Sequence, residues 1–265
     1  MLILIRGAGD IASGIGWRLC RSGFSVAMTD LEHPTAVRWK AAFCQAMWTR
    51  HCEVEGVTAV RCDSPSGAEA ALARGEIPIL PDPDGRAIRD LHPDVVVDAI
   101  LAKCNLGTCI TDAPLVIGVG PGFTAGEDCH CVIETMRGHT LGRCIYSGSA
   151  IPNTGIPGSV GGYTVERVLR TPCGGVFEPL KEIGDAVNAG ETVARVDGQP
   201  VVSRITGCLR GVLPVGTLVP KAGFKAGDVD ARCVREHCFT ISDKALAIGG
   251  GVLEAVCHWR SEREN

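Results

Sequence analysis

The stretch LIRGAGDIASGIGWRL, residues 4–19, decides the fold, because it puts a short apolar strand directly before a glycine-rich turn and a helix. Gly7, Gly9 and Ala12 have the Gly-x-Gly-x-x-(Gly/Ala) spacing of dinucleotide-binding turns. In such a turn the first glycine permits the bend, the second lets the backbone approach a diphosphate, and the small third residue lets the helix pack closely on the sheet. The amide groups that begin the helix then face the phosphates.

Two acidic residues belong to this predicted site. Asp30 ends the next predicted strand, where an acid commonly binds ribose hydroxyls. Asp10 adds a negative charge beside the phosphates unless it points away, caps the helix or binds a cation. The predicted cofactor-binding residues at this turn are therefore Gly7, Gly9, Asp10, Ala12 and Asp30. The alternative is that the glycines only turn the chain.

The first half of the chain alternates between apolar runs and helical patterns. The candidate strands are Leu2–Ile5, Val26–Thr29, Val57–Arg61, Ile77–Leu80, Val95–Ile100 and Leu115–Val119. Continuous apolar runs suit strands buried on both faces of a parallel sheet. The apolar spacing after residue 10 predicts a helix that stops at Ser22-Gly23, and residues 36–47 are also compatible with a helix. We therefore expect an α/β fold: a Rossmann-like, mostly parallel sheet with helices on both faces.

Further residues are candidates for the same cleft. Gly118, Gly120, Gly122 and Thr124 follow a predicted strand, so the nearby amides could line a site at its carboxyl end. Lys103 follows another predicted strand, where a cation could meet a phosphate or carboxylate. Ordinary turns and a solvated lysine are the alternatives.

From about residue 170 the pattern changes to short β-segments separated by glycine. Gly175, Gly184 and Val187 are repeated 32 residues later as Gly207, Gly216 and Val219. This repeat resembles the hammerhead barrel of biotinyl and lipoyl domains, although the turn at 196–200 has no lysine to modify. We expect a nucleotide-binding domain over 1–165, a small β-barrel domain over 166–228, and a C-terminal segment with a helix over 229–265 that returns to the first domain.

Composition limits the classes of partner. A net charge of −4 in 265 residues gives no reason to expect nucleic acid or an anionic membrane surface. The apolar start is interrupted at Arg6, too early for a signal-peptide core, so a cytoplasmic location is expected. The fourteen cysteines then favour reduced thiols.

Recognisable catalytic and metal-binding motifs are missing from the sequence. Cys129-His130-Cys131 and Cys233…Cys238 do not form a paired Cys-x-x-Cys framework, so no metal site is predicted. Walker, Gly-x-Ser-x-Gly and His-Glu-x-x-His motifs do not occur. The sequence therefore identifies no catalytic residue and leaves open whether the protein is an enzyme.

Several longer blocks carry a family resemblance. They include IRGAGDIASGIGWRLCRSGFSVAMTDLEHPTAVRW, APLVIGVGPGFTAGEDCHCVIETMRGHTLGR and CFTISDKALAIGGGVLEA. Together they resemble the YqeB family of selenium-dependent molybdenum hydroxylase system proteins. The resemblance implies an accessory role in maturing these hydroxylases, with a hydroxylase as partner.

The identity of the bound nucleotide stays open at this point. An NAD(P) cofactor and a molybdopterin dinucleotide both contain the diphosphate that the turn at Gly7 would bind. Two other functions compete with the accessory role: an NAD-dependent oxidoreductase, and a non-catalytic scaffold that docks the hydroxylase.

Overall fold

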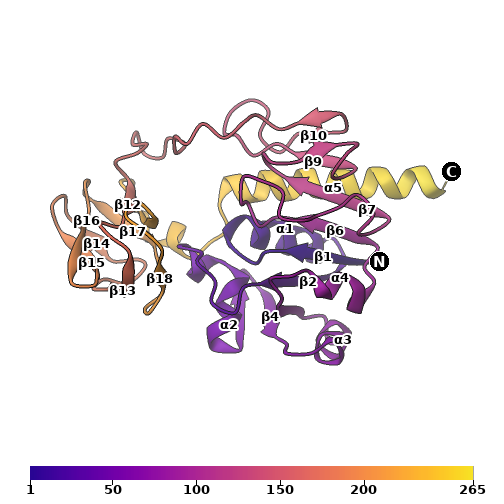
Figure 1. The fold of residues 1–265 in the computed structure, drawn as a ribbon, viewed down its shortest axis with the longest axis horizontal. Coiled ribbons are helices and arrows are strands. Elements are labelled where there is room, and N and C mark those ends of the chain that lie inside the picture. Colours follow the sequence, from indigo (N-terminus) through magenta and orange to yellow (C-terminus); the bar gives the residue numbers. More distant parts are fainter. Residues whose placement is uncertain (265) are drawn as a thin grey trace. The chain divides into compact units, whose positions relative to one another are not determined.

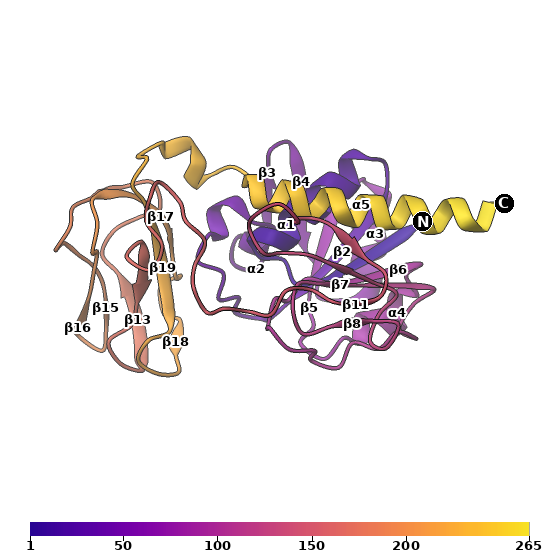
Figure 2. The same cartoon turned by 90° about the horizontal axis from the view of Figure 1, so that it is seen from above.

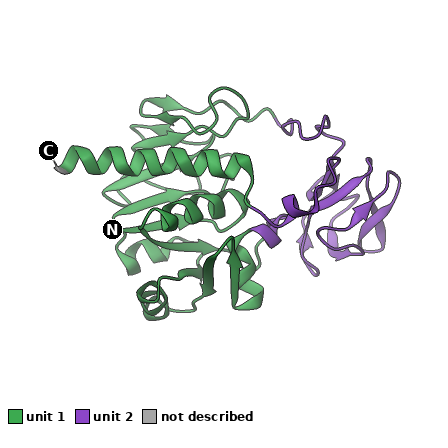
Figure 3. Cartoon of the chain, turned by 180° about the vertical axis from the view of Figure 1, so that it is seen from behind, with its two compact units in different colours: residues 1–34, 42–154, 241–265 green, residues 35–41, 155–240 purple. Residues whose placement is uncertain are grey.

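The computed structural model describes residues 1–264, which form two compact units (Figure 3). Unit 1 comprises residues 1–34, 42–154 and the described part of 241–265, and unit 2 comprises residues 35–41 and 155–240. The sequence-based division differs in that it has boundaries after residues 165 and 228. Unit 2 also takes in a short segment from the N-terminal half of the chain.

Unit 1 is built on a nine-stranded sheet with the order β10-β9-β7-β6-β1-β2-β5-β4-β3 (Figure 1). Its strands are β1 (Leu2–Arg6), β2 (Ser25–Asp30), β3 (His51–Val54), β4 (Val57–Arg61), β5 (Ile77–Pro81), β6 (Val95–Asp98), β7 (Leu115–Val119), β9 (Cys131–Ile133) and β10 (Cys144–Ile145). All neighbouring pairs from β9 to β4 are parallel, whereas β3 and β10 are antiparallel edge strands. A separate pair joins β8 (Thr124–Ala125) to β11 (Gly148–Ser149). The predicted α/β class with a mostly parallel sheet is confirmed.

The strand order reverses next to β1. From β1 the chain passes to β2, then to β3 and β4 at the far edge, and returns to β5 between β2 and β4. It later fills the other side of β1 with β6, β7 and β9. In open α/β sheets, ligands bind beyond the carboxyl ends of the strands at such a reversal. The carboxyl ends of β1 and β6 are therefore the place to look for a site.

The helices of unit 1 cover both faces of this sheet. They are α1 (Asp10–Arg21), α2 (Ala46–Thr49), α3 (Pro65–Ala73), α4 (Arg86–Leu91) and α5 (Asp243–Glu264). Ala87 of α4 packs in one cluster with Leu4 and Val96. On α1, a Cβ added at Gly16 would lie near Ile5 and Met28. Successive side chains of a strand point to opposite faces, so α1 and α4 lie on opposite sides of the sheet.

Helix α5 packs along α1 (Figures 1 and 2), and glycines make this close approach possible. A Cβ added at Gly249 would lie 2.8 Å from the Gly14 carbonyl oxygen, and one added at Gly14 would lie 2.6 Å from the Ala245 Cβ. Within the run 249–251, Gly251 faces the Gly142 backbone, whereas Gly250 has nothing within 4 Å. Within residues 1–264, no helix combines the length and the apolar character needed to cross a membrane.

Residues 36–47, whose sequence is compatible with a helix, do not form one continuous helix. The segment instead contains two 3₁₀ turns, η1 (Trp39–Ala41) and η2 (Phe43–Gln45), followed by α2. Ala42 between the two turns is extended, with φ −142° and ψ 145°. The Trp39 indole donates to the Val212 carbonyl, 3.0 Å away. These tertiary contacts within unit 2 override the local helical preference.

Unit 2 contains two four-stranded antiparallel sheets, β12-β19-β17-β14 and β16-β15-β13-β18. Their strands are β12 (Val168–Arg170), β13 (Gly175–Pro179), β14 (Ala186–Val187), β15 (Thr192–Val196), β16 (Gln199–Val202), β17 (Gly207–Val212), β18 (Leu218–Val219) and β19 (Lys225–Asp230). The sequence repeat appears as exchanged strand pairs: Val187 pairs with Gly207, and Gly175 pairs with Val219. Each half of the repeat thus completes the sheet of the other half.

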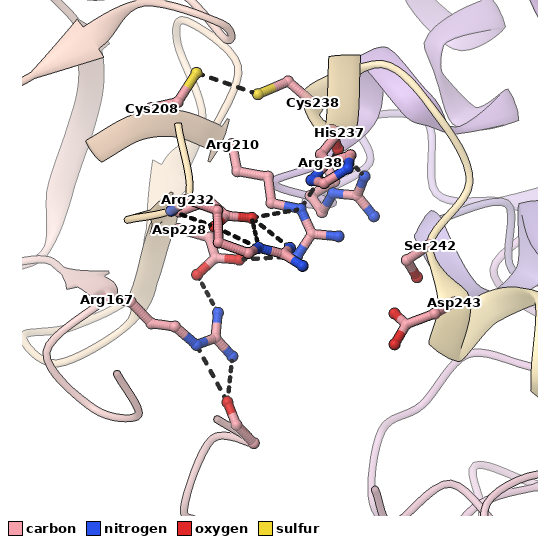
Figure 4. A network of polar contacts seen from close by, with 12 residues as sticks. Arg38, Arg167, Cys208, Arg210, Asp228, Arg232, His237, Cys238, Ser242 and Asp243 are labelled. Atoms are coloured by element: carbon pink, nitrogen blue, oxygen red, sulfur yellow. Dashed lines mark hydrogen bonds and ion pairs between the residues drawn. The ribbon is translucent and has the colours of Figure 1, made fainter. Parts of the chain in front are cut away.

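Unit 2 also buries several charges (Figure 4). Arg167 bonds the Asp228 carboxylate through Nη1 and the Gly158 carbonyl oxygen through Nε and Nη2, at 3.2 and 3.0 Å. Arg232 donates to the Asp230 carboxylate at 2.6 Å through Nη2. Burial alone would raise the pKa of Asp230, but these hydrogen bonds from Arg232 hold it below its usual value. The short 3₁₀ helix η3 (Arg235–Cys238) follows.

Candidate nucleotide site

The turn after β1 requires glycine at its first position. Gly7 has φ +102°, which L side chains rarely adopt, and its amide donates to the Thr29 carbonyl oxygen at 2.8 Å. A Cβ at this position would lie 2.9 Å from the carbonyl oxygen of Ala99, just after β6. Gly7 therefore lets the backbone that follows β1 approach the backbone that follows β6, at the point where the strand order reverses.

Helix α1 begins immediately beyond this turn. Gly9 is its N-cap residue, has extended backbone angles and supplies no side chain to cap the helix. Gly9 and Asp10 are half-buried, while Ala12 is buried beneath them. A helix start without a side-chain cap presents amide groups and the positive end of the helix dipole. This geometry suits an anionic group.

Asp30, at the end of β2, bonds to the turn itself. Its Oδ2 accepts a hydrogen bond of 2.9 Å from the Ala8 amide, and its Oδ1 accepts one of 2.8 Å from the Leu31 amide. Burial raises the pKa of this carboxyl, and the two amides offset part of that rise. Each carboxylate oxygen has a second lone pair, so Asp30 can still accept from a ligand hydroxyl.

One side of the turn is covered by η2. The Cys44 amide donates to the Ala8 carbonyl oxygen at 2.9 Å, and the Ser13 hydroxyl donates to the same oxygen at 3.0 Å. Phe43 and Cys44 are fully buried. Burial, followed by the nearby charge of Asp30, raises the pKa of the Cys44 thiol well above its usual value. The thiol is thus a packing group, whereas Gly9 and Asp10 of the turn are half-buried.

The other predicted site residues lie in loops that follow β6 and β7. Gly122 has φ +111°, and a Cβ there would lie 2.7 Å from the Cα of Cys104. The loop after β7 therefore contacts the loop after β6 at Cys104, the residue next to Lys103. Lys103 itself is exposed. Gly120 has φ +84° and donates its amide to the Ile133 carbonyl oxygen at 2.9 Å.

Thr124 makes a local contact instead of facing the turn after β1. Its hydroxyl lies 3.1 Å from the Ser149 hydroxyl, within the β8–β11 pair. The structure thus brings Gly7, Gly9, Asp10, Ala12 and Asp30 together at one turn. It joins the loops of Lys103 and Gly122 to each other.

Sequence reasoning missed a buried polar group at the same edge of the sheet. Arg6, the last residue of β1, bonds Asp98, the last residue of β6, with 3.4 Å between Nη1 and Oδ2. The Thr108 hydroxyl accepts a hydrogen bond from Arg6 Nη1 and donates one to Asp98 Oδ2, 2.6 Å away. All three residues are buried. The signal that could have revealed them is a charged residue ending each of two apolar strands.

Comparison with known proteins gives one close relative. The chain is 49% identical to "Uncharacterized protein YqeB" of Escherichia coli strain K12. The match extends over 255 residues, or 96% of this chain. The chain belongs to the YqeB family. It spans about half of that relative's length, 47%. The family resemblance expected from the glycine-rich blocks is therefore confirmed, while the relative's name gives no activity.

Two other comparisons add little to this family assignment. No family model matches the chain. The crystal structure of an aspartoacylase family protein from Mesorhizobium loti is 11% identical, covers 86% of this chain and 83% of that chain, and has a TM-score of 0.25. A score this low carries no argument about fold or function.

Proposed function

We propose that unit 1 binds a nucleotide whose linked phosphates lie against the start of α1. The observation that carries the proposal is the turn itself: Gly7 with φ +102° against Ala99, an uncapped helix start at Gly9, and Asp30 bonded to the Ala8 amide. In nucleotide-binding α/β folds the first glycine permits the sharp turn, the start of the helix binds the phosphates, and the acidic residue binds the ribose hydroxyls.

Each residue has a distinct task in this proposal. Gly9 lets the phosphates approach the amides of the first helical turn, and buried Ala12 lets α1 sit close to the sheet. Asp30 accepts from ribose hydroxyls and repels a 2′-phosphate, which favours NAD over NADP. Asp10 and Asp30 both oppose phosphates electrostatically, so a divalent cation accompanying the nucleotide would increase its affinity. NAD and a molybdopterin dinucleotide are the proposed cofactors.

Calorimetry with NAD, NADP, CTP and GTP, each with and without Mg²⁺, tests the site. Gly9→Asp is the informative variant, because aspartate is a favourable N-cap residue that preserves the helix while its carboxylate blocks phosphates. Ser66→Asp adds the same charge in the first turn of α3 and serves as the control. We expect Gly9→Asp to weaken binding at least tenfold and Ser66→Asp to leave it unchanged. Equal binding by both variants excludes this turn.

The biological role follows from the family resemblance. We propose an accessory role in the maturation of selenium-dependent molybdenum hydroxylases, with the hydroxylase as partner. Deleting the gene in a host that makes such a hydroxylase should leave the hydroxylase polypeptide present but inactive. Normal hydroxylase activity in the deletion strain contradicts the role.

The exchanged strand pairs support a further proposal for unit 2. Val187 with Gly207, and Gly175 with Val219, relate the halves as in the interlocking barrels of biotinyl and lipoyl domains. The hairpin between β15 and β16 turns at Asp197-Gly198 and carries no lysine, so a swinging-arm role is not proposed. We propose instead that unit 2 docks the partner hydroxylase.

Asp30 also supports a second candidate function. A carboxylate at the end of β2 is the feature that NAD-dependent oxidoreductases use to hold the adenosine ribose. Incubation with NADH and a panel of small carbonyl compounds, followed by NADH absorbance, tests for hydride transfer. Tight NAD binding without turnover contradicts the oxidoreductase and leaves the binding proposal intact.

A further inference from the structure

A pocket of about 320 Å³ lies beside Arg6, at the carboxyl edge of the parallel sheet. Its wall includes Arg6 from the end of β1, Gly85 and Ile88 at the start of α4, and Leu106 from the segment after β6. The volume is at the small end of the range for ligand pockets. The strand order reverses between β1 and β6, so the pocket occupies the position where open α/β sheets bind ligands.

Arg6 contributes a buried cation to this wall with part of its hydrogen-bonding capacity unused. Only 5% of the residue is exposed. Its contacts with Asp98 and Thr108 both use Nη1, and within residues 1–264 its Nε and Nη2 have no partner. Nε and Nη2 together form the edge of a guanidinium that binds the two oxygens of a carboxylate.

Gly85 lies beside this edge and has no side chain to cover it. A Cβ added at Gly85, which has φ +74°, would lie 3.7 Å from Arg6 Nη2, so the glycine leaves the space beside the guanidinium unfilled. Ile88 and Leu106 supply apolar surface next to it.

The pocket wall also contains three other charged residues, Asp84, Arg89 and Asp112. The Asp84 carboxylate is 2.9 Å from Arg86 Nη2, and Asp112 accepts from the Cys109 amide at 2.9 Å. Arg89 adds a second cation. Asp98 accepts hydrogen bonds from Arg6, Thr108 and the Ile100 amide, and its negative charge offsets that of Arg6. Asp98 does not line the pocket.

We propose that this pocket binds a small organic acid, with its carboxylate on the Nε–Nη2 edge of Arg6 and its carbon skeleton against Ile88 and Leu106. The site is separate from the nucleotide turn, and its occupation does not require a nucleotide. If the nucleotide proposal fails, this one still stands.

Ligand-observed NMR on the full chain, without nucleotide, tests the pocket. The probes are acetate, pyruvate and benzoate, with inorganic phosphate as the contrast, each up to about 10 mM, which detects dissociation constants in the millimolar range. We expect at least one carboxylate to bind and phosphate to bind more weakly. Absence of binding by all three carboxylates, or tighter binding of phosphate, overturns the proposal.

Two variants locate the binding. Arg6→Lys keeps a cation opposite Asp98 but removes the two-pronged edge, and Leu106→Trp fills the pocket from an exposed position without touching the Arg6–Asp98 pair. We expect both to weaken carboxylate binding at least tenfold, with the Tm of Leu106→Trp unchanged. Should Arg6→Lys fail to fold, Leu106→Trp still decides. Wild-type affinity in Leu106→Trp overturns the assignment of the ligand to this pocket.

Discussion

The Asp30 carboxylate accepts a hydrogen bond of 2.9 Å from the Ala8 amide, so the acid that ends β2 is attached to the glycine turn that follows β1. This contact ties together the two parts of the predicted nucleotide site. It also takes a carboxylate out of water, and burial raises its pKa. The cost of that burial gives the first prediction.

Asp30→Asn should lose one of the two backbone hydrogen bonds at every pH, because asparagine has a single acceptor oxygen for the Ala8 and Leu31 amides. Its stability relative to the wild type should nevertheless rise between acidic and neutral pH. Because the folded-state pKa of Asp30 is raised, ionisation weakens the fold as the pH rises through that pKa. Well below the unfolded-state pKa of about 4 the carboxyl is protonated in both the folded and unfolded states, and the pH-dependent part of the difference vanishes. Urea unfolding of both proteins from pH 3 to pH 8 measures it. A constant difference across this range contradicts the account.

Gly249→Ala and Gly250→Ala should have opposite effects. The new Cβ at position 249 would lie 2.8 Å from the Gly14 carbonyl oxygen, so we expect a loss of about 1–3 kcal/mol from overpacking between α1 and α5. Position 250 has nothing within 4 Å, so alanine should add about 0.5–1 kcal/mol of helix stability. Denaturant unfolding of both variants measures the difference. Equal effects would contradict the close packing of α1 on α5.

Arg167→Met should destabilise unit 2 strongly. It leaves the Asp228 carboxylate, 4% exposed, without its nearest cation, which typically costs about 3–5 kcal/mol (Figure 4). Arg86→Met removes an arginine from the exposed pair with Asp84 and should cost less than about 1 kcal/mol. Thermal unfolding of the two variants compares them. Similar Tm values would show that the buried pair is not a major source of stability.

Thiol labelling should follow burial. Cys104, Cys109, Cys233 and Cys257 are exposed and should react first with iodoacetamide in the native protein. Cys208 and Cys238 are buried with their sulfur atoms 3.5 Å apart, and burial raises the pKa of Cys238 to about 12. They should react only after unfolding. Peptide mass spectrometry gives the order, and early labelling of Cys238 would contradict the packing of η3.

The sequence predicted six of the seven parallel strands because these six are apolar runs, whereas the short buried strand β9 was not predicted. Two of the six candidate strands coincide with β4 and β7, and the other four overlap β1, β2, β5 and β6. The edge strand β3, His51–Val54, was not predicted, since it has neither a continuous apolar run nor a buried position on both faces. Local patterning thus identifies the longer apolar strands better than the short ones β9 and β10 and the edge strand β3.

Tertiary contacts explain what the sequence did not predict. The helical pattern of residues 36–47 is broken because Trp39 bonds within unit 2 and Cys44 bonds to the turn in unit 1. The Arg6–Asp98 pair joins residues 92 positions apart, and only the pairing of β1 with β6 brings them together. Glycine spacing revealed the turn, but no spacing rule connects Arg6 to Asp98.

Amide hydrogen exchange with the tightest-binding nucleotide from the calorimetric panel tests the central claim most directly. If phosphates lie against the start of α1, the nucleotide should slow exchange in peptides covering residues 7–13, and Gly9→Asp should abolish this protection. Binding that protects other parts of the chain while leaving residues 7–13 unchanged would contradict it.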